Sequence, residues 1–326
     1  MMNQAMHKFE AYQEIFHELK TKYKWSFSDN RILMMAASLY VANEKEFNLK
    51  RYDEIVEYIK GEVGLFSTLK GNDRFTFAAM LDTKFDDSKA AFKEFIQTYD
   101  SVIEAGFHRS TFSYIAAMVA LTGEKDASDA IPRSYDIYKS MKSNHFFFTG
   151  MDDYPLAMLL AQRELEKDAM MAEIESFYQK LNEAGFRKSN ELQSMSHILS
   201  LEGKTNPDTL VSRCQEMFSL MKESGLKPKA MHYPHIALLA FLDQAKVNLH
   251  QVVDIFDQLN AEKDFKWQKD FNLVMAIQLL IAEKVGESTV LSTALHSTIQ
   301  ALIQAQQAAC IAAVSGATAA ASTAGA

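Results

Sequence analysis

The sequence predicts an all-α protein, an α-solenoid of about seven helix-turn-helix repeats with a period of about 40 residues. Three observations predict this fold: a segment that recurs and ends in glycine, a second marker with the same period, and a low content of helix-breaking residues. The chain has only 12 Gly and 5 Pro among 326 residues. Turn-rich β architectures normally use more of both, so long helices are expected.

The first marker is an amphipathic segment that ends in glycine and an apolar residue. Three copies are TYDSVIEAGF, FYQKLNEAGF and MFSLMKESGL, with glycines at Gly106, Gly185 and Gly225. Around the middle copy, apolar residues from Ile174 to Leu181 recur at the spacing of one helix face. Because glycine often ends a helix in the left-handed conformation, each copy predicts the end of the first helix of a repeat.

The second marker is a small residue in the middle of each second helix, replaced once by histidine. The seven positions are Ala37, Ala79, Ala117, Ala157, His197, Ala237 and Ala276. A small side chain lets two helices approach closely, and each hairpin exposes an apolar face until its neighbour covers it. We therefore expect the hairpins to stack into a solenoid over residues 1–286.

The composition changes after the seventh repeat. Residues 287–309 are expected to form an amphipathic helix that caps the open end of the solenoid. Residues 310–326, which include the stretch SGATAAASTAGA, have no charge and little bulk, and predict a flexible tail.

Charge and cysteine content indicate the surroundings of the protein. The net charge of −8 disfavours nucleic acid and anionic lipid as partners. Cys214 and Cys310 form no disulfide framework, and Cys214 is expected to be a buried, inert thiol on an apolar helix face. The N-terminal segment lacks the apolar core of a signal peptide, and no stretch is long enough to span a membrane. We expect a cytoplasmic protein.

Two resemblances follow from these residues. The segments YQKLNEAGF and FSLMKESGLKP resemble pentatricopeptide and tetratricopeptide repeats, which implies stacked helical hairpins. The RNA-binding members of that class are typically basic, so the resemblance bears on the fold and not on RNA binding. Over its full length, including the Ala-rich end, the chain also resembles an uncharacterised bacterial family classed as a domain of unknown function, number four thousand and three. That resemblance implies no activity.

The common catalytic and phosphate-binding motifs are absent from the sequence. There is no His-Glu-x-x-His, no Gly-x-Ser-x-Gly and no Gly-rich phosphate loop. The sequence therefore favours a protein without enzymatic activity and without a cofactor, although missing motifs do not exclude an enzyme.

A candidate partner-binding site lies in the fourth repeat, where the connection reads HFFFTGMDDYP. Consecutive residues cannot all point to one side of a helix, so some of the three phenylalanines are expected at the surface. The candidate partner-binding residues are Phe146, Phe147, Phe148, Tyr154 and Tyr233. Alternatively, the rings fill a bend between the two halves of the solenoid.

A candidate metal site follows from the same connection and its counterpart two repeats later. The candidate ligands are Asp152, Asp153, His232 and His235, with Glu191 or His197 as further candidates. Packed helices lie about 8–10 Å apart and the fifth repeat lies between the two connections, which argues against a shared ion. Alternatively, the carboxylates only complement the positive end of a helix dipole.

A third candidate is a basic rim formed by the connections inside the hairpins. Its residues are His108, Arg109, Arg187, Lys188, Lys227, Lys229, Lys266 and Lys269. Such a rim could attract an anionic partner, or it could simply complement the negative ends of helices. We interpret the chain as a non-enzymatic helical-repeat scaffold that binds a protein or peptide on its concave surface. RNA binding and metal-dependent catalysis are the alternatives.

Overall fold

A computed structural model describes residues 4–26, 29–65, 67–145, 147–287, 298–303 and 305–306. The described residues form α-helices and short 3₁₀ helices with no strand, which confirms the predicted all-α class. None of the described helices is long and apolar enough to cross a membrane.

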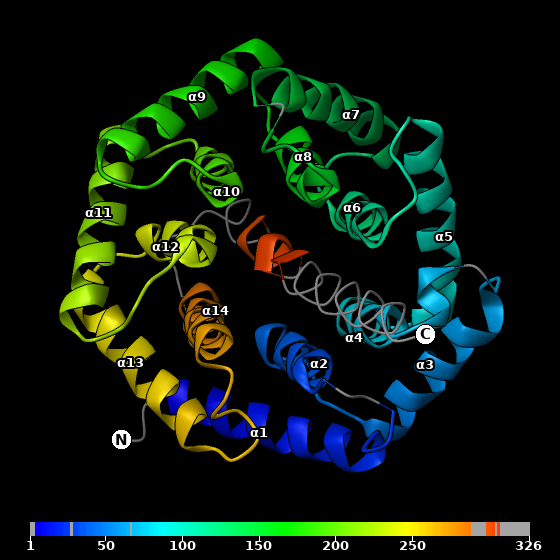
Figure 1. Cartoon of the computed structure of the whole chain (residues 1–326). Helices are drawn as coiled ribbons and strands as arrows, with labels where there is room; N and C mark the ends of the chain where they lie inside the picture. Colours follow the sequence, from blue (N-terminus) through cyan, green and yellow to red (C-terminus); the bar gives the residue numbers. More distant parts are fainter. Residues whose placement is uncertain are drawn as a thin grey trace, which may run out of the picture.

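The α-helices alternate along the chain between an outer and an inner layer (Figure 1). The outer helices are α1 (Gln4–Lys22), α3 (Leu49–Glu62), α5 (Ser88–Glu104), α7 (Ala127–Asn144), α9 (Lys167–Glu183), α11 (Pro207–Glu223) and α13 (Ala245–Ala261). The inner helices are α2 (Arg31–Ala42), α4 (Asp73–Lys84), α6 (Thr111–Thr122), α8 (Tyr154–Ala161), α10 (Asn190–Ser200), α12 (Tyr233–Ala240) and α14 (Lys269–Glu287). Each inner helix packs against the outer helix before it. Neighbouring inner helices also contact one another, α4 and α6 through the rings of Phe77 and Tyr114.

The two layers close into a ring, in which the last hairpin packs against the first (Figure 1). Helix α1 contacts α13 and α14, and α14 contacts α2. Phe16 of α1 packs edge-to-face against Phe265, with ring centroids 4.7 Å apart, and Gln13 donates a 2.7 Å hydrogen bond to Glu262. The structure is therefore a closed ring, whereas the predicted capping helix assumed an open end.

The glycine marker correctly locates the ends of α5, α9 and α11. Gly106, Gly185 and Gly225 have φ values of +115°, +99° and +85°, a conformation that other residues rarely adopt. After Gly185, the Phe186 N–H donates back to the Leu181 carbonyl at 3.1 Å, and the Phe186 ring is buried. This geometry is that of a Schellman cap, in which an apolar residue packs back on the helix that it ends.

Part of the C-terminal segment lies at the centre of the ring (Figure 1). Residues 298–303 and 305–306 are helical, and Ile299, Leu302 and Ile303 are buried in the common core. Thr298 and Ala301 line a hollow together with the C-terminal ends of α6, α8 and α10. A closed ring has no free end to cover, and its apolar centre receives this segment instead. Residues 288–297, 304 and 307–309 of the predicted capping helix, and the predicted tail 310–326, lie outside the described residues.

Candidate functional site

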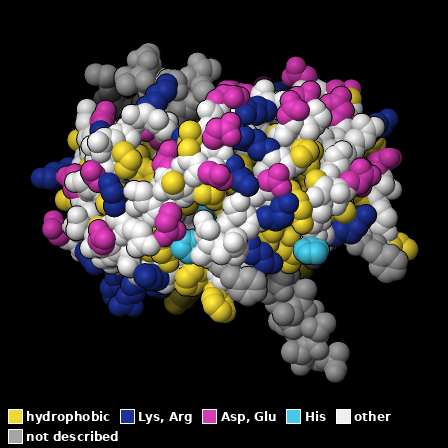
Figure 2. Space-filling model, turned by 90° about the horizontal axis from the view of Figure 1, so that it is seen from above, with side chains coloured by type: hydrophobic (Ala, Val, Ile, Leu, Met, Phe, Trp, Pro, Cys, Tyr) yellow, Lys and Arg dark blue, Asp and Glu magenta, His cyan; other side chains and the backbone are white. Residues whose placement is uncertain are grey.

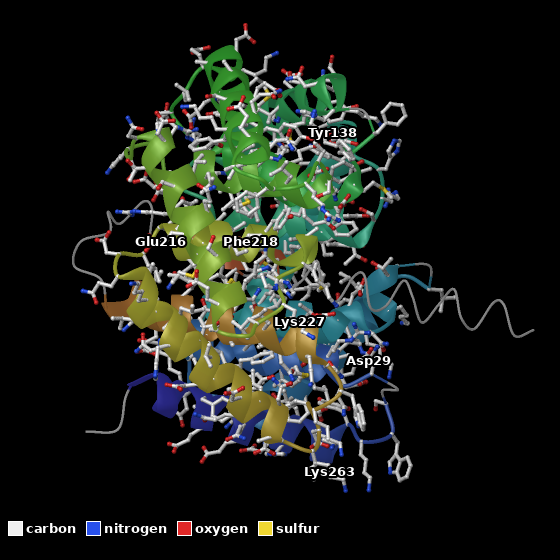
Figure 3. All side chains as sticks on the ribbon, turned by 60° about the vertical axis from the view of Figure 1, so that its left-hand side comes forward. Asp29, Tyr138, Glu216, Phe218, Lys227 and Lys263 are labelled. Carbon is white, nitrogen blue, oxygen red and sulfur yellow. The ribbon has the colours of Figure 1, made fainter. Side chains whose placement is uncertain are left out.

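The two faces of the ring carry different connections. Outer helices run toward one face and inner helices return from it, so all outer-to-inner connections meet there. We call this the hairpin face, made of the described residues 23–26, 29–30, 63–65, 67–72, 105–110, 145, 147–153, 184–189, 224–232 and 262–268. In Figure 3, Asp29, Lys227 and Lys263 from three of these connections lie to the right of Glu216, which is midway along α11. The inner-to-outer connections form the opposite face.

The charges of the two faces have opposite signs. The hairpin face contains nine Lys and Arg against five Asp and Glu, and the opposite face contains four against ten. The basic residues of the hairpin face are Lys24, Lys70, Arg109, Arg187, Lys188, Lys227, Lys229, Lys263 and Lys266; the acidic ones are Asp29, Asp152, Asp153, Glu262 and Asp264. The opposite face has Lys45, Lys125, Arg163 and Lys204 against Glu44, Glu46, Asp86, Asp87, Glu124, Asp126, Glu164, Glu166, Glu202 and Asp243. An acidic protein thus has one positive face, which can attract anionic partners.

Exposed large apolar side chains also gather on the hairpin face. Those in the described part of the chain are Trp25, Leu65, Phe147, Met151, Met231 and Trp267, whereas Val247 lies at the start of α13 on the opposite face. In the edge-on view of Figure 2, hydrophobic and basic side chains project along the lower edge, and most acidic side chains lie above them. Exposed aromatic and Met side chains that gather on one surface are typical of sites that bind other molecules.

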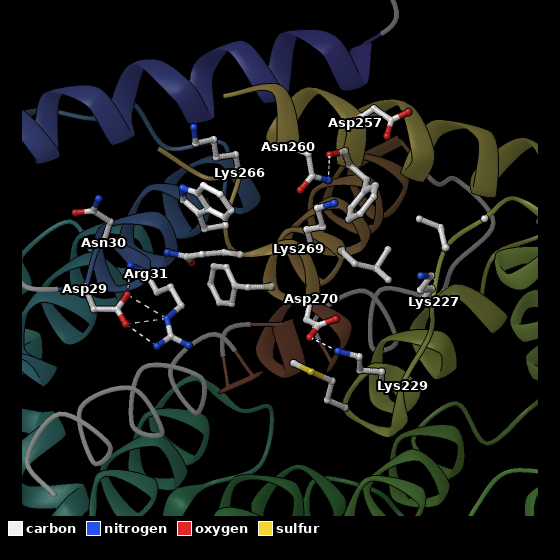
Figure 4. A pocket seen from close by; sticks show the side chains of 18 residues that line it. Asp29, Asn30, Arg31, Lys227, Lys229, Asp257, Asn260, Lys266, Lys269 and Asp270 are labelled. Atoms are coloured by element: carbon white, nitrogen blue, oxygen red, sulfur yellow. Dashed lines mark hydrogen bonds and ion pairs between the residues drawn. The ribbon is translucent and has the colours of Figure 1, made fainter. Parts of the chain in front are cut away.

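A large hollow opens on the hairpin face where the ring closes. Its volume is about 1110 Å³, and residues 29–31, 225–231, 256–260 and 266–273 contribute to its lining. We call it the seam pocket. Figure 4 shows that its cations come from three directions: Arg31 from the start of α2, Lys227 and Lys229 from the α11–α12 connection, and Lys266 and Lys269 from the α13–α14 connection and the start of α14.

Two of these five cations are neutralised by neighbours. Arg31 forms a bidentate pair with Asp29, at 2.5 Å for the closest contact, and Lys229 pairs with Asp270. The side chains of Lys227, Lys266 and Lys269 form no ion pair within the described part of the chain. The Lys266 ammonium lies 5.1 Å from the centre of the Trp267 ring. The pocket therefore combines uncompensated positive charge with an exposed aromatic surface.

Tyr154 and Tyr233 are not at the surface, as a partner-binding role would require. They are 1% and 4% exposed and lie at the starts of α8 and α12. The Tyr154 ring packs edge-to-face on Phe107, with centroids 4.7 Å apart, and Tyr233 packs in the same way on Phe186 at 5.0 Å. Each tyrosine joins its own hairpin to the preceding one and belongs to the core.

The phenylalanine cluster is divided between surface and core. Phe147 is 93% exposed and Phe148 is half-buried, while Phe146 lies outside the described residues. Of the predicted partner-binding residues, Phe147 is thus accessible to a partner.

Three of the four metal-ligand candidates, Asp152, Asp153 and His232, make separate local contacts. Asp153 accepts a 2.9 Å hydrogen bond from the Gly150 N–H, and Asp152 accepts one of 2.7 Å from the Asn190 amide. His232 Nδ1 accepts a 2.8 Å bond from the Lys229 N–H, so its Nε2 carries the proton and donates to the Asp270 carbonyl at 3.2 Å. Among the described residues, no three His, Cys, Asp or Glu side chains are grouped so that they could hold a metal ion.

Burial determines the protonation of these groups. It raises the pKa of Asp153 to about 8, with a smaller contribution from the Asp152 charge, so this carboxyl is largely protonated near neutral pH. Burial lowers the pKa of His232, and it lowers the pKa of His235 and of His197 to about 3. Burial also raises the pKa of the Cys214 thiol, as expected for an inert cysteine. These groups act as neutral parts of the core.

The predicted basic rim separates into distinct parts. Lys227, Lys229, Lys266 and Lys269 meet in the seam pocket, whereas Arg109 lines another hollow, of about 510 Å³, with Leu65 and Tyr99. Arg187 and Lys188 are exposed on the hairpin face, and neither is among the pocket residues.

Sequence reasoning missed Arg31 and Trp267. Trp267 comes from the hairpin that follows Lys227 in the chain, whereas only ring closure brings Arg31 beside them.

Together, the fold and the site define an all-helical ring protein with a basic and apolar face. The chain belongs to the family described as protein of unknown function (DUF4003), whose model matches residues 15–308. It is 38% identical over 296 residues to the uncharacterized protein YeaA of Bacillus subtilis (strain 168), which covers 89% of each chain. The resemblance to a bacterial family of unknown function is confirmed. No solved structure matches the chain.

Proposed function

We propose that this protein is a non-enzymatic helical-repeat scaffold that binds a protein or peptide partner on its hairpin face. In this proposal the seven hairpins are repeats of the kind found in pentatricopeptide and tetratricopeptide proteins, here closed into a ring. The observation that carries the proposal is the gathering of exposed large apolar side chains and Lys and Arg on one face. Apolar anchors surrounded by complementary charge are typical of protein-binding surfaces.

The centre of the ring is a less suitable site for a partner. A solenoid normally presents its concave surface to ligands. Here the inner helices face residues 298–303 and 305–306, of which Ile299, Leu302 and Ile303 are buried. The proposed partner-binding site is therefore the hairpin face and not the concave surface of the ring.

A protein partner agrees better with the charge distribution than RNA does. RNA binding relies on many phosphate contacts along a continuous basic track. The net charge of this chain is −8, and the exposed Asp152 carboxylate interrupts the basic residues of the hairpin face at the α7–α8 connection. A peptide needs only a few anchors and a few cations.

The proposal is tested by selecting binders from a displayed library of random peptides against the full chain. We expect recovered peptides to bind less tightly to Phe147→Ala and Trp267→Ala variants, because both side chains are exposed on the hairpin face, 93% and 86% respectively. The matched control is Val247→Ala, an exposed apolar residue of the opposite face. Selected peptides that bind all three variants equally well, or tighter binding of single-stranded RNA than of any peptide, would contradict the proposal.

A further inference from the structure

We propose that the seam pocket binds a carboxylate-rich peptide segment, with its lysines on the carboxylates and its apolar wall on a neighbouring side chain. This inference rests on the proposed function and specifies the chemistry of the partner.

The shape of the pocket favours a segment of chain over a small molecule. Its volume of about 1110 Å³ is at or above the range of about 300–1,000 Å³ typical of small-molecule sites. It is bordered by residues of the first, sixth and seventh hairpins. A peptide of several residues could lie across the seam and contact all three.

The charge inside the pocket is positive after its ion pairs are counted. The acidic residues that line it are Asp29, Asp257 and Asp270. Asp29 is paired with Arg31, and Asp270 with Lys229. The charges of these two pairs cancel, and the remaining charged side chains of the pocket are three lysines and one aspartate. An incoming carboxylate therefore meets a net positive field.

Two of the pocket cations occupy positions that helices disfavour. The first turn of a helix carries partial positive charge, so cations are better placed near its C-terminus. Among the seven inner helices, only α2 and α14 begin with a cation, Arg31 and Lys269 respectively. Both helices line the seam pocket. A carboxylate already lies at each of these helix starts, because Asp29 accepts a 2.9 Å hydrogen bond from the Arg31 N–H and Asp270 follows Lys269. The positive field of the pocket therefore comes from Lys227, Lys266 and Lys269.

The walls of the pocket are also apolar. Leu226, Met231, Trp267 and Phe271 line it, and Met231 and Trp267 are exposed. A ligand that alternates carboxylates with apolar side chains satisfies both parts of the surface. A nucleic-acid backbone has a denser charge, which Asp257 and the net charge of −8 would repel.

The chain supplies its own fluorescent reporter for a test. It has two tryptophans, so in a Trp25→Phe background the emission comes from Trp267 alone. The probe is a synthetic peptide of glutamates with a central phenylalanine. We expect saturable binding with a blue shift of the Trp267 emission, because the ring loses contact with water. A peptide in which glutamine replaces every glutamate should bind at least tenfold more weakly.

Variants locate the binding in the pocket. Lys227→Gln together with Lys269→Gln is expected to weaken binding of the acidic peptide about tenfold, and more at low salt than at high salt. The matched control is Lys188→Gln, a lysine of the same face outside the pocket, which should change binding less than twofold. All three lysines are exposed, so circular dichroism should show unchanged folding.

The outcomes separate this inference from the proposed function. Equal binding of the glutamine peptide, unchanged binding to the Lys227→Gln, Lys269→Gln variant, or tighter binding of an oligonucleotide would overturn the pocket proposal. If library-selected peptides still bind the hairpin face in that case, the proposed function stands without the pocket. If no peptide binds at all, both fail.

Discussion

The connections α7–α8 and α11–α12 share one backbone design and differ in chemistry. Each contains a 3₁₀ turn, Met151–Asp153 or Ala230–His232, followed by Tyr-Pro at the start of an inner helix. In each, the last residue of the turn caps a backbone N–H three residues earlier: Asp153 caps Gly150 and His232 caps Lys229. Each tyrosine hydroxyl accepts a long hydrogen bond, of 3.4 or 3.3 Å, from the preceding hairpin.

The side chains around this shared design differ in charge. The α7–α8 connection has the exposed carboxylate of Asp152, the buried and largely protonated Asp153, and the exposed Phe147. The α11–α12 connection has Lys227 and Lys229, which line the seam pocket. The residues common to both connections therefore hold the fold, and we expect binding properties to depend on the residues that differ.

The largest expected effect comes from removing a shared tyrosine. Tyr154→Ala and Tyr233→Ala should each lower the free energy of unfolding by about 3–5 kcal/mol, because each leaves a cavity in a packed aromatic cluster. Denaturant unfolding measures both variants. The corresponding changes to Phe should cost under about 1.5 kcal/mol, since only one long hydrogen bond is lost. A small effect of both Ala variants would show that the tyrosines do not join the hairpins.

The two caps should respond to pH in opposite directions. The pKa of Asp153 is raised from 3.8 to about 8 in the folded chain, so its contribution to stability is full at low pH and falls as the pH rises toward 8. The pKa of His232 is lowered from 6.5, so its contribution is present above pH 6.5 and falls as the pH drops below that value.

Two variants measure this difference. As the pH rises from 5 to 8, the free energy of unfolding of Asp153→Asn should increase by about 3 kcal/mol relative to that of the natural chain, at about 1.4 kcal/mol per pKa unit. His232→Asn should become more stable relative to the natural chain as the pH falls from 7 to 5. Unfolding curves over this pH range, compared with those of the natural chain, test both. Parallel pH profiles for the two variants would contradict the assigned protonation states.

Charge reversal in the α7–α8 connection should make it resemble its counterpart. Asp152→Lys removes an exposed carboxylate and one hydrogen bond from Asn190. We expect the association rate of the acidic peptide to increase about twofold at low salt, because the hairpin face becomes more positive. Stopped-flow measurements at two salt concentrations test this. An increase that persists unchanged at high salt would point to a cause other than long-range electrostatics.

The smallest expected effect on stability is that of Phe147→Ala. The side chain is 93% exposed, so the free energy of unfolding should change by less than about 0.5 kcal/mol. Thermal unfolding would detect a larger loss, which would show that this ring packs inside the fold and does not serve a partner.

Local features of the fold could be predicted from the sequence, because they depend on neighbouring residues. Glycine at Gly106, Gly185 and Gly225 predicted helix ends correctly, since only the left-handed conformation fits there. The correspondence between the Asp pair and His232 was also visible, although the capping contact was not. Ring closure could not be predicted, because it depends on the sum of small rotations between hairpins, to which no single residue contributes decisively.

The candidate site could be predicted only in part for the same reason. The lysines of the α11–α12 connection and the start of α14 were recognisable as a basic rim. Their grouping with Arg31 requires closure, which places residues about 200 positions apart side by side. Tyr154 and Tyr233 were misassigned because a Tyr-Pro helix start gives no sign of whether the ring faces solvent or the preceding hairpin.

Hydrogen-exchange mass spectrometry of the full chain, with and without a selected acidic peptide, directly tests whether the peptide binds to the hairpin face at the seam pocket. We expect slower exchange in residues 224–232 and 262–268 on the hairpin face and in residues 269–271 at the start of α14, with unchanged exchange in residues 241–244 on the opposite face. Protection confined to the opposite face or to the centre of the ring would contradict it.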